Sequence, residues 1–89
     1  MSKKVTFSYY CDPGHGWVKV ERKRLNELGL LDKISNYSYQ RNDNVYLEED
    51  SDLDIFLKAM RQAGYSVQFK QQHTNRRSKI RNYSGFYNG

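Results

Sequence analysis

Two segments of the chain alternate between apolar and polar side chains, and this alternation most constrains the fold. In residues 4–10, Val5, Phe7 and Tyr9 fall on one face, and the residues between them fall on the other. Residues 65–70 (YSVQFK) repeat the pattern. A period of two residues is typical of a half-buried β-strand. The chain must therefore build a sheet with one apolar face, which a second layer has to cover.

Turn residues divide the remaining strand-like sequence into two hairpins. Residues 11–16 (CDPGHG) combine Pro13, which fixes φ, with two glycines, which permit positive φ, and a strand resumes over residues 17–20. A second hairpin is predicted over residues 37–48, where Asn42-Asp43-Asn44 supplies the turn. Each hairpin precedes a segment with helical character.

Two helices are predicted, over residues 21–28 and about 51–63. Gly29 and Gly64 follow them as natural stops, and Ser51 is the expected N-cap of the second. The second helix has the clearer apolar stripe, at i, i+3, i+4 and i+7 spacing: Leu53, Phe56, Leu57 and Met60.

These elements predict one small α+β domain, with a mainly antiparallel sheet in ββα-ββα-β order and helices packed on one face. A chain of 89 residues is too short for two ordinary domains. We expect a compact domain over residues 1–70 and a basic, aromatic tail over 71–89. A polar tail of this kind stays ordered only if it packs on the domain or on a partner.

Charge is distributed unevenly along the chain. The net charge of +5 is the sum of +3 over residues 1–47, −5 over 48–56 and +7 over 57–89, and the last segment has no acidic residue. Such asymmetry indicates the kind of partner rather than the fold. A basic C-terminal third favours nucleic acid or an acidic protein face.

The tail also interleaves cations with aromatic rings. Cations attract phosphates and aromatic faces stack on bases, so this composition favours contact with RNA or single-stranded DNA. Arginine also pairs with carboxylates, which would suit an acidic protein. The alternative is a solvated tail whose aromatic side chains fold back on the sheet. The candidate binding residues here are Arg76, Arg77, Lys79, Arg81, Tyr83 and Tyr87.

Tyrosines form a second candidate surface. A core this small is not expected to hold all four of these tyrosine side chains: Tyr10, Tyr37, Tyr39 and Tyr46. Tyrosine and arginine are enriched at binding hot spots, so Tyr37, Tyr39 and the alternating Arg41 are candidate contact residues. The alternative is a set of cross-strand tyrosine pairs that stabilise the sheet.

The loop from Cys11 to Trp17 contains a thiol, a carboxylate and an imidazole. A thiol nucleophile needs a base held by a third group. No second histidine lies nearby, and Asp-Pro-Gly is ordinary turn sequence. We therefore do not expect this loop to be catalytic, and we expect the protein not to be an enzyme. Two readings remain open: His15 and Trp17 contact a partner, or Asp12 caps the turn and Trp17 belongs to the core.

Five carboxylates lie within residues 48–54 (EEDSDLD). Their spacing does not match an EF-hand loop, so helix capping and compensation of the helix dipole are the preferred explanation, with docking of a basic partner as an alternative. We expect no metal and no cofactor. The chain contains no phosphate-binding glycine loop, nucleophile elbow or zinc-ligand spacing, and its one cysteine excludes a disulfide framework. We also expect no membrane span, no small-molecule substrate and a cytoplasmic location.

The chain resembles a small family of bacteriophage- and prophage-encoded proteins. The resemblance spans nearly the whole chain, through the segments DPGHGW (12–17), KIS (33–35), YSYQR (37–41), VYLEED (45–50) and IRNY (80–83). It implies the host cytoplasm as location. It also implies an accessory role, because small phage proteins without catalytic motifs often bind and block host machinery, anti-CRISPR proteins among them.

From the resemblance and the residues together we expect a stoichiometric anti-defence inhibitor that binds through tyrosine and arginine. Its partner would be a host protein or ribonucleoprotein, such as a CRISPR–Cas effector. Because the chain is basic, it would occupy an acidic face of the target or bind its guide RNA rather than mimic DNA. The alternative is an accessory protein that binds RNA or single-stranded nucleic acid through the basic C-terminal segment.

Overall fold

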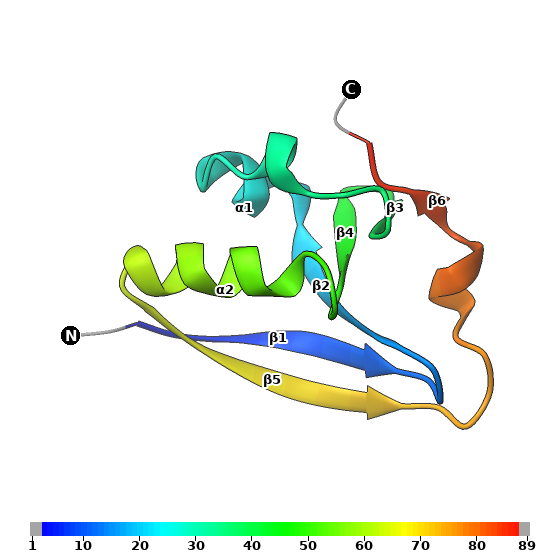
Figure 1. The fold of residues 1–89 in the computed structure, drawn as a ribbon. Helices are drawn as coiled ribbons and strands as arrows, with labels where there is room; N and C mark the ends of the chain where they lie inside the picture. The colour runs from blue at the N-terminus through cyan, green and yellow to red at the C-terminus, as the bar shows by residue number, and fades with distance from the viewer. Residues whose placement is uncertain (1–2, 88–89) are drawn as a thin grey trace.

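The fold combines one six-stranded sheet with two α-helices and two short 3₁₀ helices, η1 and η2 (Figure 1). A computed structural model describes residues 3–87; residues 1, 2, 88 and 89 of the predicted domain and tail lie outside the described residues. The elements are β1 (Lys3–Cys11), β2 (Gly16–Glu21), α1 (Arg22–Glu27), η1 (Leu31–Lys33), β3 (Tyr39–Arg41), β4 (Asn44–Glu48), α2 (Leu53–Gln62), β5 (Tyr65–His73), η2 (Lys79–Asn82) and β6 (Ser84–Gly85).

The strand order across the sheet is β5-β1-β2-β4-β3-β6. Four pairings in the described residues are antiparallel, and the pairing of β1 with β5 is parallel, with Lys3 opposite Tyr65 and Cys11 opposite His73. The predicted α+β class and the ββα-ββα-β order are confirmed. The sheet is mixed because α2 carries the chain from β4 across to the far edge, so that β5 runs in the same direction as β1.

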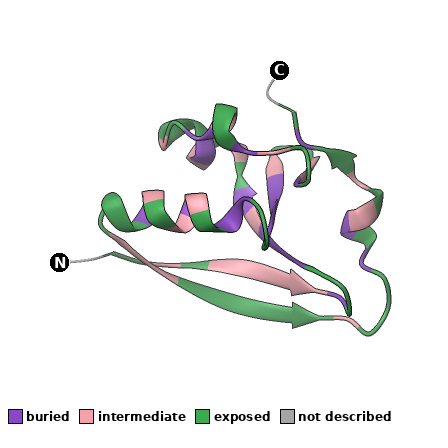
Figure 2. Cartoon of the chain, in the orientation of Figure 1, coloured by how far each residue is buried: buried purple, intermediate pink, exposed green. Residues whose placement is uncertain are grey.

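The main core lies between the helices and one face of the sheet. Strand residues two apart share a face, so the alternation in β1 turns Val5, Phe7 and Tyr9 toward the helices. The ring of Phe56 from α2 is fully buried and meets Phe7 edge-on, with ring centroids 5.2 Å apart. The same cluster holds Leu25 of α1, so both helices cover this face, while much of β5 is exposed (Figure 2).

The helix ends agree with the sequence except at one cap. Gly29 and Gly64 follow the helices with φ of +71° and +89°, in the left-handed region that glycine adopts without strain. The predicted Ser51 cap is wrong: α2 begins after Asp52, whose side chain makes no capping bond. The Asp52 carboxylate instead accepts hydrogen bonds from Ser35 and Ser38, because the chain preceding α2 packs against these serines.

The C-terminal segment folds back on the domain. Ser78 accepts a hydrogen bond from the backbone N–H of Ile80 and so caps η2, and the Ile80 side chain is buried. The short β6 pairs with β3, and Phe86 then enters the main core. This segment completes the edge of the sheet next to β3. No helix within residues 3–87 is long and apolar enough to cross a membrane.

Candidate functional site

The turn between β1 and β2 is organised by the carboxylate of Asp12. Its Oδ1 atom accepts hydrogen bonds from the backbone N–H groups of Gly14 and His15, both at 2.9 Å. A side-chain cap of this kind satisfies turn amides that would otherwise need water. The structural reading of Asp12 as a turn cap is confirmed.

Asp12 also holds the C-terminal segment. The Arg81 guanidinium donates to Oδ2 from Nε at 2.6 Å and to Oδ1 from Nη2 at 2.9 Å, and the Ser78 backbone N–H donates to Oδ2 at 2.9 Å. These donors, Arg81 foremost, hold the pKa of the Asp12 carboxyl well below its usual range. The Arg81 guanidinium lies 5.2 Å from the centre of the Trp17 ring, so it is fixed on two sides.

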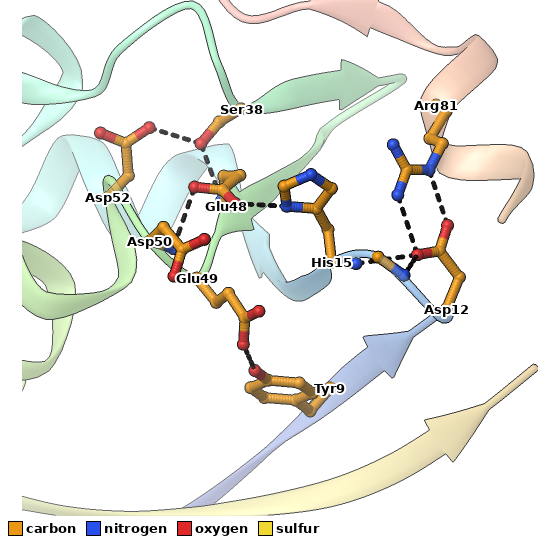
Figure 3. A network of polar contacts seen from close by, with 10 residues as sticks. Tyr9, Asp12, His15, Ser38, Glu48, Glu49, Asp50, Asp52 and Arg81 are labelled. Atoms are coloured by element: carbon orange, nitrogen blue, oxygen red, sulfur yellow. Dashed lines mark hydrogen bonds and ion pairs between the residues drawn. The ribbon is translucent and has the colours of Figure 1, made fainter. Parts of the chain in front are cut away.

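A pocket of about 300 Å³, which we call the turn pocket, opens beside this turn. It lies where the β1–β2 turn, the end of β4 and the chain preceding β3 meet (Figure 3). Its walls combine aromatic, acidic and cationic side chains: His15, Trp17, Tyr37, Tyr39, Glu48, Asp50, Ser51 and Arg81.

Three potential ligand groups converge in the turn pocket. One ligand atom from each of His15, Glu48 and Asp50 lies within 4.8 Å of the others. The Nδ1 atom of His15 is 3.3 Å from Oε1 of Glu48, as the dashed line in Figure 3 marks. Pairing of Trp17 with Glu48 across β2 and β4 brings Glu48 beside the turn.

A hydrogen-bond network fixes the Glu48 side chain and backbone. Its Oε2 atom accepts from the Asp50 backbone N–H at 2.9 Å, and its own backbone N–H donates to Ser38 Oγ at 2.9 Å. Ser38, fully buried, donates in turn to the Asp52 carboxylate. The Asp50 N–H therefore orients the Glu48 carboxylate, and Ser38 holds the backbone that carries it.

Cys11 and its neighbours are not arranged as a nucleophile with a base. Asp12 bonds to backbone amides and Arg81, and the His15 ring faces Glu48. Burial, followed by the nearby charges of Glu49 and Asp12, raises the pKa of the Cys11 thiol. This shift favours the protonated, weakly nucleophilic form of the Cys11 thiol.

The Tyr9 hydroxyl donates to the Glu49 carboxylate, and burial together with this bond raises the pKa of Tyr9 far above its usual value.

The face of the sheet away from the helices carries a second concave site. Two hollows of about 270 and 530 Å³ share Arg41, Asn42, Lys79 and Tyr83 among their lining residues, and we call their union the sheet groove. The remaining lining residues come from β1 to β4 and from the C-terminal segment: Tyr10, Lys19, Gln40, Asn44, Tyr46, Ser78, Ile80, Asn82 and Ser84.

A run of aromatic rings forms the floor of the sheet groove. The ring centroids of Tyr10 and Tyr46 are 6.1 Å apart, and those of Tyr46 and Tyr83 are 5.1 Å apart. The Arg41 guanidinium lies 5.1 Å from the centre of the Tyr83 ring and donates to its hydroxyl at 3.2 Å. Burial raises the pKa of Tyr46. The groove thus joins stacked rings to cationic side chains.

The predicted candidate residues separate into three groups. His15, Trp17, Tyr37, Tyr39 and Arg81 line the turn pocket. Arg41, Lys79 and Tyr83 line the sheet groove. Arg76 and Arg77 are exposed between β5 and η2, and Tyr87 is exposed where its carbonyl accepts a hydrogen bond from Arg22.

Some predicted contact residues are less accessible than expected. Trp17 is 1% exposed, so a protein partner could not bury it further; it packs with Tyr46 and Ile80. Tyr46 is also buried, because the C-terminal segment covers this part of the sheet. Of the four tyrosines expected at the surface, Tyr37 is exposed, whereas Tyr10 and Tyr39 are half-buried. Arg81 faces Asp12 rather than solvent.

Sequence reasoning missed several residues of both sites. The sequence pattern indicates only strand and turn positions for three residues of the sheet groove, Lys19, Asn42 and Asn44. Glu48 and Asp50 were assigned to helix capping, although they precede α2 by several residues. The alternation of β2 and β4 does place Lys19 opposite Tyr46 on the helix-free face once their register is known.

No family model matches the chain, and neither a curated protein nor a solved structure matches it.

Proposed function

We propose that the protein binds single-stranded nucleic acid in the sheet groove and acts by binding rather than by catalysis. The observation that carries the proposal is the array of Tyr10, Tyr46 and Tyr83 rings, next to Lys19, Arg41 and Lys79 in one concave surface. An open sheet with aromatic side chains is a recurring platform for unpaired bases. Because Tyr46 itself is buried, the half-exposed rings of Tyr10 and Tyr83 and the exposed Arg41 guanidinium are the groups on which bases would stack.

The charge around the groove favours a phosphate backbone. Lys4 and Lys70 are exposed, and strand alternation and the register of β1 with β5 put them on the same face as Lys19. Glu21 is the one exposed carboxylate that alternation puts on this face of β2. The cations outnumber it, so the face attracts an extended polyanion through counterion release.

The groove also offers amide side chains for base edges. Asn42, Asn44 and Asn82 line it, and each has both a donor and an acceptor. Asn42 adopts a φ of +55° at the β3–β4 turn, a conformation that asparagine tolerates better than most residues. We expect modest base preference, because the contacts are few and stacking accepts every base.

Equilibrium binding to labelled oligonucleotides tests this function. Fluorescence anisotropy with single-stranded RNA, single-stranded DNA and duplex DNA should give tighter binding to the single strands. The logarithm of the association constant should fall linearly with the logarithm of the salt concentration, by about 0.7 for each phosphate contacted. Undetectable binding, or affinity that does not change with salt, would contradict the proposal.

An anti-defence inhibitor is the second candidate, and two exposed rings favour it. Tyr37 and Tyr87 expose 70% and 63% of their surface, as protein-binding tyrosines do before a partner covers them. Expression of the protein in bacterial strains with active CRISPR–Cas systems should restore transformation by a plasmid that those systems target. Tyr37→Ala should weaken this restoration. Failure to restore transformation in any strain would reject the inhibitor role in the host cytoplasm while leaving oligonucleotide binding intact.

A further inference from the structure

We propose that His15, Glu48 and Asp50 bind one divalent transition-metal ion, with Zn²⁺ as the preferred ion, in the turn pocket. The sheet groove and the turn pocket share no lining residue, so this inference goes beyond the proposed function. The donor set is one imidazole nitrogen and two carboxylates.

The spacing of the donors suits a single ion. Ligand atoms bound at about 2.0–2.2 Å to a tetrahedral ion lie about 3.4 Å apart. The His15 Nδ1 and Glu48 Oε1 atoms are 3.3 Å apart without an ion, and one ligand atom of Asp50 lies within 4.8 Å of both residues' ligand atoms. A small rotation of the exposed Asp50 side chain would close the site.

A buried oxygen gives the independent indication of a ligand. Glu48 is 8% exposed, and its Oε1 atom is buried without a hydrogen bond. The Nδ1 atom of His15 lies 3.3 Å from this oxygen in an ion-pair contact that is not a hydrogen bond. An unsatisfied buried carboxylate oxygen is costly. Figure 3 shows this carboxylate pointing toward the His15 ring, into the space that an ion would fill.

A second unsatisfied atom lines the same pocket. Among residues 3–87, the buried side-chain polar atoms without a hydrogen-bond partner are Glu48 Oε1 and Trp17 Nε1, and both residues line the turn pocket. Three protein ligands leave a coordination position for water or an anion. A bound anion there would suit a pocket whose lining includes the cationic side chain of Arg81.

The surroundings hold the key ligand in place. Ser38 and the Asp50 backbone N–H fix Glu48, and the Asp52 carboxylate fixes Ser38. Such supporting hydrogen bonds orient metal ligands and tune their affinity. Zn²⁺ is preferred over Mg²⁺ and Ca²⁺ because an imidazole nitrogen suits Zn²⁺, whereas the other two ions prefer oxygen ligands.

Isothermal titration calorimetry on the full, untagged chain tests the site after chelator treatment. We expect one Zn²⁺ per chain and an increase in the melting temperature when Zn²⁺ binds. His15→Ala and Asp50→Asn change exposed residues and should each lower the Zn²⁺ affinity by at least about tenfold. His73→Ala and Asp54→Asn are the matched controls on exposed residues outside the pocket and should keep the affinity.

The competing outcomes are distinct. Absence of Zn²⁺ binding up to millimolar concentration would overturn the proposal. Binding that survives His15→Ala but is lost in Cys11→Ser or His73→Ala would also overturn it. Such a result would place the ion at Cys11 and His73, which pair across β1 and β5. Equal affinity for Mg²⁺ and Zn²⁺ would also overturn it, since the imidazole would then contribute nothing.

Discussion

The carboxylate of Asp12 accepts two hydrogen bonds from the guanidinium of Arg81, at 2.6 and 2.9 Å, across 69 residues of sequence. The Asp12 side chain is 1% exposed and that of Arg81 is 24% exposed. The same carboxylate caps the β1–β2 turn and anchors η2 through the Ser78 N–H. One pair therefore fixes the turn that presents His15 and the segment that presents Lys79 and Tyr83.

Loss of the Asp12 carboxylate should destabilise the whole domain. Asp12→Ala leaves the Arg81 charge and three backbone amides without their acceptor, so the free energy of unfolding should fall by about 3 kcal/mol. Urea unfolding followed by circular dichroism measures it. Asp32→Ala, at an exposed position, should change it by less than about 0.5 kcal/mol. Equal effects of the two variants would contradict the assigned role.

Acid should remove the contribution of Asp12. Its pKa in the folded chain lies well below the value of about 3.9 that an unfolded aspartate has, so the folded state binds fewer protons in this range. The stabilisation is therefore complete above about pH 5 and is lost progressively as the pH falls below that. Stability measured from pH 6 to pH 2 should decline less steeply in Asp12→Ala than in the natural chain. Parallel declines would show that other carboxylates account for the loss.

The close approach of Tyr9 to Gly16 should exclude a larger residue. A Cβ atom at Gly16 would lie 2.7 Å from the Tyr9 ring, which packs over this position and reaches Glu49. Gly16→Ala should lower the free energy of unfolding by about 1–3 kcal/mol through overpacking. Gly85→Ala is the control, because its nearest neighbour would be at 3.5 Å. The Gly16 penalty should shrink in a Tyr9→Ser background, and a penalty unchanged there would place the clash elsewhere.

Ser38 should be more important than its size suggests. Ser38→Ala removes one oxygen, but leaves the buried Glu48 N–H without an acceptor and the Asp52 carboxylate without one donor. We expect a loss of about 1–3 kcal/mol, measured by urea unfolding. Ser84→Ala, at an exposed position, should be nearly neutral. A neutral Ser38→Ala would show that water replaces the hydroxyl.

Local patterns predicted the elements because each one depends on neighbouring residues. The alternation around Phe7 and Phe69 identified two strands, and the stripe containing Phe56 identified α2. Alternation specifies which residues share a face but not which strand lies alongside. The parallel pairing of β1 with β5 was therefore not predictable from either segment.

The sites depend on contacts between distant residues, so less of them was predictable. His15 and Tyr37 were candidate contact residues, but their meeting with Glu48 requires the register of β2 with β4. Core size alone favours a surface position for the tyrosines, because a chain this small has room for few aromatic side chains in one core. The fold instead gives Tyr46 a second apolar cluster beneath Ile80, on the face that the helices leave open.

Binding of a charge-matched pair of variants to single-stranded RNA tests the central claim most directly. Lys19, Arg41 and Lys79 line the sheet groove, whereas Lys23, Lys33 and Lys58 are exposed on α1, η1 and α2. Each triple alanine variant removes three positive charges. The groove variant should lose most of its affinity and reduce the salt slope by about 2, while the helix-side variant keeps both nearly unchanged. Equal losses in the two variants would show that net charge alone drives binding and would contradict the sheet groove as the site.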